Sequence, residues 1–312
     1  MGIHFLTPLA AALAVAAALP LLGWALRERK DDHARLAMGL GRPRRLLRAE
    51  TGLYSVAAIA ALAVAAAQPT FHRYSSIRVR TESEAYFVFD TSRSMLARRR
   101  PKSPSRFERA TTVGLRMRRD LADVRVGVGS LTDRPLPHLL PTPDEQAFAA
   151  VVQQAIGIDK PPPEQRVHLA TDYASLADIG NANWFDPGIS RRLVVLFTDG
   201  ETRDYLASQL LSTLHSSHVS LIAVRVSRSG ESIYLRNGTR DPGYRFDPST
   251  SGLSGLRAFG ENQVGAAVRA ARAVVDRGPR AGAGRVDRTT PLGRYAVLAA
   301  ALPITLLLFR RR

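Results

Sequence analysis

Residues 86–100 read YFVFDTSRSMLARRR: four apolar residues lead directly into an aspartate, and two alternate serines and a block of arginines follow. A strand that is apolar at every position is typical of a parallel sheet covered by helices on both faces. In open sheets of this kind, ligands bind just beyond the carboxyl ends of the strands. Asp90 takes that position. The stretch therefore predicts a buried strand that ends at a ligand site.

Strands and helices alternate along the chain after this strand. Ser105-Arg-Phe-Glu108 has the form of a capping box, and the apolar residues behind it recur at helical spacing. Residues 191–200, RRLVVLFTDG, predict a second apolar strand that leads into an acid, Asp199. The other expected elements are strands at 124–128 and 219–226, an antiparallel edge strand at 135–142, helices at 145–156, 204–217 and 264–275, and a long loop at 228–251. This order predicts an α/β domain with a Rossmann-like, mainly parallel sheet and helices on both faces.

Oxygen-bearing side chains gather at the expected carboxyl edge of this sheet. A third segment, HLATDYASLADI at 168–179, adds a threonine and an aspartate that open an expected helix. The candidate metal ligands are Asp90, Ser92, Ser94, Thr171 and Asp199. Carboxylates and hydroxyls are the hard oxygen ligands that Mg²⁺ accepts while it keeps several waters. The pattern predicts a site for a divalent ion, either Mg²⁺ or else Mn²⁺ or Ca²⁺.

At these residues the chain resembles the von Willebrand factor A (VWA) family. The metal-ion-dependent adhesion site of that family combines D-x-S-x-S, a later threonine and an aspartate in a T-D-G turn, and all five positions occur here in order. The resemblance implies a VWA domain that binds a protein partner through the metal. The alternative is that Ser92 and Ser94 cap the next helix, and that Thr171 and Asp199 are ordinary turn residues.

The order of elements and the PSRFERA stretch after the metal motif are similar to the BatA/BatB group of bacterial membrane-anchored VWA proteins. That resemblance implies other VWA membrane proteins and a MoxR-type AAA+ ATPase as partners. One departure is a basic cluster after the motif: Arg98, Arg99, Arg100, Lys102 and Arg106. Arg98–Arg100 are candidate partner-binding residues that steer an acidic protein toward the metal. Two alternatives for this cluster are that it is a solvated loop or that it lies near anionic lipid headgroups.

Three apolar segments are candidate membrane spans. Residues 5–26 and 51–70 carry no charged residue, and at about 1.5 Å per helical residue each is long enough for a hydrocarbon core of about 30 Å. A cleaved signal peptide is the alternative for the first, but its charges follow the apolar run instead of preceding it. Residues 292–309 form the third candidate if Arg294 snorkels to an interface; otherwise this segment is an interfacial or buried helix.

Basic residues predict the orientation of these spans. Residues 27–50 contain eight Lys or Arg against four acids, and the chain ends in three arginines, so both segments are expected in the cytoplasm. The expected organisation is two transmembrane helices in 1–70 with a cytoplasmic loop at 27–50, a VWA domain at 78–285, and a transmembrane helix with a basic tail at 291–312. The VWA domain of this multi-pass membrane protein then lies outside the cytoplasm.

Composition and motifs argue against several other functions. The formal net charge of +17 is compatible with nucleic-acid binding, but no nucleic-acid-binding motif is visible in the sequence. The chain has no cysteine, which excludes disulfides and thiolate metal sites. The sequence also shows no catalytic motif: position 92 is Ser where a dehalogenase-like phosphatase needs an acid, and there is no phosphate loop, G-x-S-x-G or H-E-x-x-H. We therefore expect a protein that is not an enzyme.

Two functions remain. The first is a membrane-anchored, metal-dependent protein-binding module that helps to assemble or mature an envelope complex, with a partner protein that supplies a carboxylate to the metal. The alternative is a factor that loads a metal into an exported enzyme such as a quinoprotein dehydrogenase. A binding module keeps its ion, whereas a loading factor passes it on.

Overall fold

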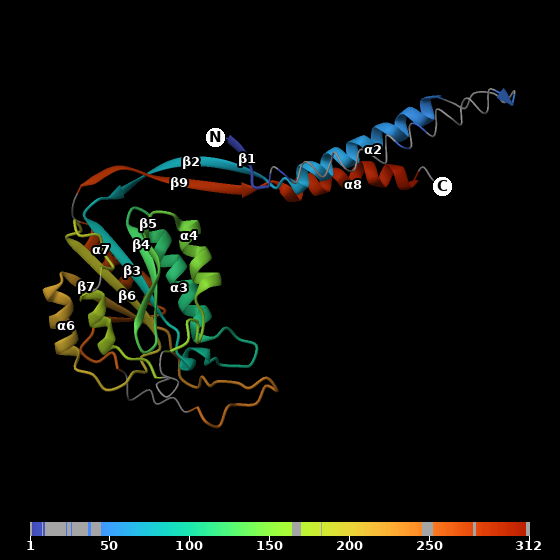
Figure 1. Cartoon of the computed structure of the whole chain (residues 1–312). Coiled ribbons are helices and arrows are strands. Elements are labelled where there is room, and N and C mark those ends of the chain that lie inside the picture. The colour runs from blue at the N-terminus through green and yellow to red at the C-terminus, as the bar shows by residue number, and fades with distance from the viewer. Residues whose placement is uncertain are drawn as a thin grey trace. The chain divides into compact units, whose positions relative to one another are not determined.

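The chain forms two compact units in the computed structural model, Ser76–Val286 and a second unit made of Met1–Ser75 with Asp287–Arg312 (Figure 1). The structure describes residues 2–7, 9, 23, 26, 37–38, 45–163, 170–181, 183–244, 252–276 and 279–309. The first expected span, the loop at 27–50 and the arginine tail at 310–312 lie largely or wholly outside these residues.

A six-stranded sheet in the order β5-β4-β3-β6-β7-β8 forms the centre of the unit Ser76–Val286. All neighbouring strands are parallel except β5, which pairs antiparallel with β4 at one edge. The strands are β3 (Ser83–Asp90), β4 (Arg125–Leu131), β5 (Pro135–Thr142), β6 (Arg191–Thr198), β7 (Val219–Arg225) and β8 (Ala258–Gly260). The predicted mainly parallel sheet with an antiparallel edge strand is therefore confirmed.

Helices cover both faces of this sheet (Figure 1). Because side chains alternate along a strand, Phe87 and Phe89 of β3 enter one hydrophobic core, while Tyr86 and Val88 enter the other. The first core includes residues of α3 (Arg106–Asp120), α4 (Glu145–Ala150) and α7 (Val264–Val275). The second includes residues of α5 (Ala177–Asn181) and α6 (Ala207–Ser216). This two-sided burial explains why β3 is apolar at every position from 85 to 89.

Helix α3 begins where the sequence predicts it. Ser105 accepts a hydrogen bond from the Glu108 backbone N–H, and the Glu108 side chain accepts one from the Ser105 N–H, which completes the capping box. Gly114 brings this helix close to the sheet, because a Cβ atom there would lie 2.6 Å from the ring of Phe89. The close approach places the start of α3 beside the carboxyl ends of β3 and β6.

The chain order creates a switch point between β3 and β6. After β3 the chain crosses to β4 on one side, and after β5 it returns to β6 on the other side of β3. In the parallel pairing of β3 with β6, Phe89 lies opposite Phe197, so that Asp90 and Thr198 end the two strands side by side. Ligand sites of open α/β sheets lie at such a point.

Several elements differ from the expected pattern. The helix expected at 145–156 becomes α4 followed by a π-helical turn at Val151–Ala155. The helix expected from Thr171 is a 3₁₀ turn at Ala174–Leu176 that continues into α5. The long loop expected at 228–251 contains backbone pairing in its described part. Ser232 pairs with Arg98, and Tyr234 pairs with Arg240, each in an isolated β-bridge. Strand β8 was not predicted, because three residues are too few for a visible pattern.

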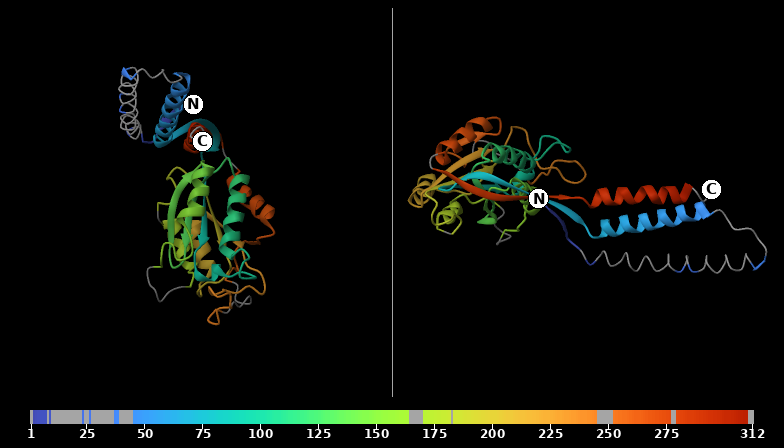
Figure 2. Two further views of the ribbon diagram at one scale, coloured as in Figure 1. Left: turned by 90° about the vertical axis from the view of Figure 1, so that its right-hand side faces the viewer. Right: turned by 90° about the horizontal axis from the view of Figure 1, so that it is seen from above.

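In its described residues, the second unit contains two helices and part of a small sheet. Helix α2 (Arg45–Ala66) lies beside α8 (Gly293–Phe309), as Figures 1 and 2 both show. A three-stranded sheet has the order β1-β2-β9, with β1 at Gly2–Phe5, β2 at Pro69–Arg80 and β9 at Arg280–Pro291. This sheet was not predicted from the sequence. In the part of the chain that the structure describes, no helix has both the length and the apolar character needed to span a bilayer.

Candidate metal centre

Asp90 is the last residue of β3 and is fully buried. Its Oδ1 accepts a hydrogen bond from the Ser92 backbone N–H (3.0 Å), and its Oδ2 accepts one from the Thr198 hydroxyl (2.7 Å). The Thr171 hydroxyl lies within hydrogen-bond distance of both oxygens, at 3.1 and 3.2 Å. All of these donors are neutral. Within the described residues, the carboxylate has no ion-pair partner.

The surroundings of Asp90 disfavour its charged form. Burial raises the pKa of Asp90, the nearby carboxylate of Asp199 raises it further, and the hydrogen bonds from Ser92 and Thr198 only partly offset these effects, so that the pKa is about 7. A carboxylate in an apolar interior is stabilised by a counter-ion or by protonation. Either a cation or a proton would therefore stabilise Asp90.

The two serines of the motif follow Asp90 in a tight turn. Ser92 precedes a 3₁₀ helix at Arg93–Leu96, but its side chain makes no capping hydrogen bond there. Instead, the hydroxyls of Ser92 and Ser94 lie 2.9 Å apart. Ser92 therefore takes the N-cap position of this 3₁₀ helix without a capping hydrogen bond from its side chain. The residue that caps α3 is Ser105.

Thr171 is held at the site by the loop that follows β6. Its carbonyl accepts a hydrogen bond from the Arg203 N–H (2.9 Å) and another from the Thr202 hydroxyl (3.0 Å). The residue is 2% exposed, and its hydroxyl points to Asp90. Thr171 therefore lies beside Asp90 although the two are 81 positions apart in sequence.

Asp199 follows β6 directly and is also fully buried. Its Oδ1 accepts a hydrogen bond from the Glu201 N–H (2.9 Å), and its Oδ2 forms an ion pair with Nη1 of Arg106 (2.8 Å). Gly200 has a φ of 97°, which side-chain-bearing residues rarely adopt. The glycine of the T-D-G turn is thus required by the backbone conformation that holds Asp199 in place.

Arg106 is the residue of this site that the sequence analysis misassigned. It was grouped with the exposed basic cluster after the motif, but its side chain is fully buried at the start of α3. Besides Asp199, it forms ion pairs with Glu231 (2.8 Å) and Glu201 (3.1 Å), and Nη1 donates to the Tyr244 hydroxyl (2.8 Å). Burial lowers the pKa of the Arg106 guanidinium, but Asp199 and the other acidic neighbours outweigh it and raise this pKa.

The sequence held one signal for this role. The capping box places Arg106 at the first position of α3, next to the carboxyl ends of the strands. A cation in the first turn of a helix is slightly unfavourable, because the helix N-terminus is itself positive, so its presence is a weak signal of nearby anions and does not identify them.

Arg98, Arg99 and Arg100 lie on a loop beside the site. Arg99 and Arg100 are exposed, and Arg98 is partly exposed. The backbone of this loop pairs with the long loop, since Arg98 and Ser232 exchange hydrogen bonds of 2.9 and 3.0 Å and the Tyr234 hydroxyl donates to the Arg99 carbonyl. Among the described residues, none of the three arginines forms an ion pair with a carboxylate. They remain candidates for contact with an acidic partner.

The five expected ligands form one group at the switch point of the sheet. Ser92 and Thr171 contact Asp90, Ser94 contacts Ser92, and Asp199 follows Thr198, which also donates to Asp90. In the described part of the chain, no cluster of three or more His, Cys, Asp or Glu side chains could hold a metal. A cation here would depend on two carboxylates and three hydroxyls, a set of hard oxygen donors that fits Mg²⁺.

Comparisons with known proteins extend to the fold alone. No protein-family profile matches the chain, and no curated protein matches its sequence. The fold is similar to that of an aerotolerance-related membrane protein from Bacteroides fragilis, with a TM-score of 0.50, 20% identity, and 62% of this chain and 98% of that chain covered. The conserved hypothetical protein BatB from Bacteroides thetaiotaomicron has a TM-score of 0.49 and 18% identity over the same shares of the two chains.

Proposed function

We propose that this protein is a membrane-anchored, divalent-metal-dependent protein-binding module of the VWA type. The observation that carries the proposal is the buried carboxylate of Asp90, which lies at the switch point of the sheet among neutral donors only. A cation bound to Asp90, Ser92, Ser94, Thr171 and Asp199 would compensate this charge. Of the divalent ions, Mg²⁺ fits the donors best, and Mn²⁺ and Ca²⁺ are the alternatives.

A bound ion would supply an open coordination position for a carboxylate of a partner protein. The residues of this chain do the rest: Asp90 and Asp199 provide negative charge, and the hydroxyls of Ser92, Ser94 and Thr171 provide neutral oxygen atoms. Arg98, Arg99 and Arg100 would attract an acidic partner toward the site. Partner binding and metal binding then depend on one another. We propose that the module binds its partner without chemical turnover and has no enzymatic activity.

Membrane anchoring is supported by the apolar surface of the second unit. Eight large side chains of α8 are exposed, among them Leu298, Leu302 and Phe309 at 68%, 69% and 72%. Leu53, Val56, Leu62 and Val64 of α2 are exposed as well. Soluble proteins rarely expose such a surface unless it contacts a membrane or another protein. The B. fragilis protein of similar fold is described as a membrane protein, which is consistent with membrane anchoring.

In the proposed topology, the apolar segments cross the cell membrane and the VWA-type unit lies outside the cytoplasm. The basic residues of 27–50 and the terminal arginines support this orientation, since positive residues favour the cytoplasmic side. The wider role would be the assembly or maturation of an envelope complex, together with other VWA membrane proteins and a MoxR-type AAA+ ATPase.

Thermal unfolding of the full-length protein in detergent tests the metal centre. We expect Mg²⁺ at millimolar concentration to raise the melting temperature, because the ion binds the folded state. Asp90→Asn should abolish this shift, whereas Asp178→Asn, which changes an exposed aspartate of α5, should keep it. The proposal fails if neither Mg²⁺ nor Mn²⁺ shifts the unfolding of the wild type, or if Asp90→Asn responds like the wild type.

A further inference from the structure

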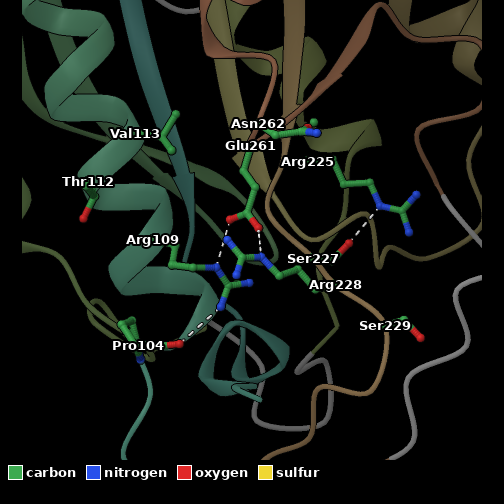
Figure 3. A pocket seen from close by; sticks show the side chains of 11 residues that line it. Pro104, Arg109, Thr112, Val113, Arg225, Ser227, Arg228, Ser229, Glu261 and Asn262 are labelled. Carbon is green, nitrogen blue, oxygen red and sulfur yellow. Dashed lines mark hydrogen bonds and ion pairs between the residues drawn. The ribbon is translucent and has the colours of Figure 1, made fainter. Parts of the chain in front are cut away.

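A second candidate site lies in a pocket of about 920 Å³ that opens between the start of α3 and the ends of β7 and β8. Figure 3 shows the side chains that line it. The lining is rich in polar and charged groups and consists of Pro104, Arg109, Thr112, Val113, Arg225, Ser227, Arg228, Ser229, Gly260, Glu261 and Asn262. None of these residues belongs to the metal centre.

Two arginines of the pocket share one carboxylate. Nε of Arg109 lies 2.9 Å from Oε2 of Glu261, and Nε of Arg228 contacts the other oxygen. In Figure 3, the two guanidinium groups converge on Glu261. Arg109 also forms an ion pair with Glu231 (2.6 Å), which lies outside the pocket. The carboxylate of Glu261 thus has both oxygens occupied.

Arg225 adds a third positive charge to the same pocket. Its Nε donates to the Ser227 hydroxyl at 2.8 Å, and Figure 3 shows its guanidinium reaching toward Ser227 instead of Glu261. Among the described residues, no carboxylate pairs with it. Its carbonyl accepts a hydrogen bond from the Glu261 N–H (2.9 Å), which fixes the two residues side by side. The lining therefore holds three guanidinium groups and one carboxylate.

The position and size of the pocket fit a bound ligand. Arg225 is the last residue of β7, and Gly260 is the last residue of β8, so that the pocket lies at the carboxyl edge of the parallel sheet. Ligands of open α/β sheets bind at this edge. The volume lies within the range of about 300–1,000 Å³ that small-molecule sites occupy. The hydroxyl of Ser229 and the amide of Asn262 offer further hydrogen bonds.

We propose that this pocket binds an oxyanion, a carboxylate or a phosphate, through Arg225 and Arg228. Guanidinium groups bind both anions with two parallel hydrogen bonds, and the net positive lining attracts them. The anion comes either from a small polar molecule or from an acidic side chain of a polypeptide. This binding does not need the metal, because the pocket shares no residue with the metal centre.

Isothermal titration of the full-length protein in detergent tests the proposal at low ionic strength. The probes are inorganic phosphate, citrate and a short polyglutamate peptide, and the protein is passed over an immobilised chelator before each titration so that no divalent ion contributes. We expect saturable binding of at least one probe. Binding of phosphate or citrate alone identifies a small molecule as the source of the anion, and binding of the peptide alone identifies an acidic polypeptide.

Arg225→Gln and Arg228→Gln should each weaken that binding by roughly tenfold or more, because a charge-assisted hydrogen bond is lost. Arg119→Gln serves as the matched control, since Arg119 is an exposed arginine at the other end of α3. Because Arg228 is exposed, its variant tests the site even if Arg225→Gln does not fold. Absence of binding for all three probes, or equal affinity in Arg228→Gln and Arg119→Gln, would overturn the proposal.

Discussion

Arg106 and Asp199 form an ion pair inside the protein, with Nη1 and Oδ2 2.8 Å apart and both side chains fully buried. The pair joins the start of α3 to the turn that follows β6. It also makes the two carboxylates of the candidate metal centre different from one another. Asp199 already has a permanent cation beside it, whereas Asp90 is surrounded by neutral donors. The cation that we propose would therefore compensate the charge of Asp90 above all.

Arg106→Gln should destabilise the protein strongly. The substitution leaves Asp199 buried without its cation and leaves Glu231 with Arg109 alone, and removal of one member of a buried ion pair costs about 3–5 kcal/mol. Urea unfolding of the full-length protein measures the change in the free energy of unfolding. Arg119→Gln should change it by less than about 0.5 kcal/mol, as is usual for an exposed position. Equal stability of the two variants would mean that Arg106 contributes nothing to the site.

The role of Arg106 shows which part of the site could not be predicted from sequence. Strands β3 and β6 could be predicted from their unbroken apolar runs, and the start of α3 from its capping box. These signals are local, since each lies within a few neighbouring residues. Arg106 stands near a run of exposed arginines, and its burial depends on Glu231, which is 125 positions away. No local pattern encodes such a contact. The pairing of β2 with β9 could not be predicted for the same reason, because most of the chain lies between these two strands in the sequence.

The stability of the unit Ser76–Val286 should decrease in acid partly through Asp123. This carboxylate forms ion pairs with Arg80 (3.1 Å) and Arg272 (2.5 Å). Burial raises the pKa of Asp123, but the hydrogen bond and charge of Arg272 and the charge of Arg80 outweigh it, so that the pKa lies below its ordinary value of 3.8. Its contribution is therefore fully present above the unfolded-state pKa and is lost as the pH falls through the lower pKa of the folded state.

Urea unfolding of the wild type and of Asp123→Asn between about pH 6 and pH 3 measures this contribution. The wild type should be the more stable protein at the higher pH. The difference in the free energy of unfolding between the two proteins should become smaller as the pH falls. A difference that stays constant over this range would show that the pKa of Asp123 is the same in both states.

Reporter fusions test the proposed orientation in the membrane. Gly230 lies on an exposed loop of the unit Ser76–Val286, so that a reporter inserted after it should fold without disturbing the sheet. We expect activity there only from a reporter that works outside the cytoplasm, and at Arg35 only from one that works inside. A cytoplasmic signal after Gly230 would contradict the proposed topology and favour nucleic acid as a partner again.

The exposed arginines beside the site should act through long-range attraction. Replacement of Arg98, Arg99 and Arg100 by Ser should reduce the Mg²⁺-dependent crosslinking of the protein to its partner in native membranes. The loss should be smaller above ~0.15 M salt, where the Debye length is about 8 Å. Arg116→Ser with Arg119→Ser removes exposed arginines of α3 and serves as the control. Equal yields in the two variants at low salt would leave the loop without a role in partner binding.

The ligands of the metal centre should differ in their effect on metal affinity. Asp90→Asn removes the charge that attracts the ion, so that EDTA and Mg²⁺ should give the same melting temperature. Thr171→Val removes a neutral oxygen that water can replace, so that Mg²⁺ should still stabilise this variant, but only at higher concentrations. Each tenfold loss of affinity lowers the stabilisation at a fixed, saturating ion concentration by about 1.4 kcal/mol.

Thr198→Val provides the matched control, because Thr198 donates to Asp90 at 2.7 Å but is not a proposed ligand. Loss of the Thr198 hydroxyl should lower the free energy of unfolding by the same amount with and without Mg²⁺. Asn is preferred to Ala at position 90, since Ala would leave the Ser92 N–H buried without an acceptor and would mix a folding defect with the loss of metal. If Thr171→Val and Thr198→Val respond identically to Mg²⁺, the threonine of the motif is a structural residue and does not contact the ion.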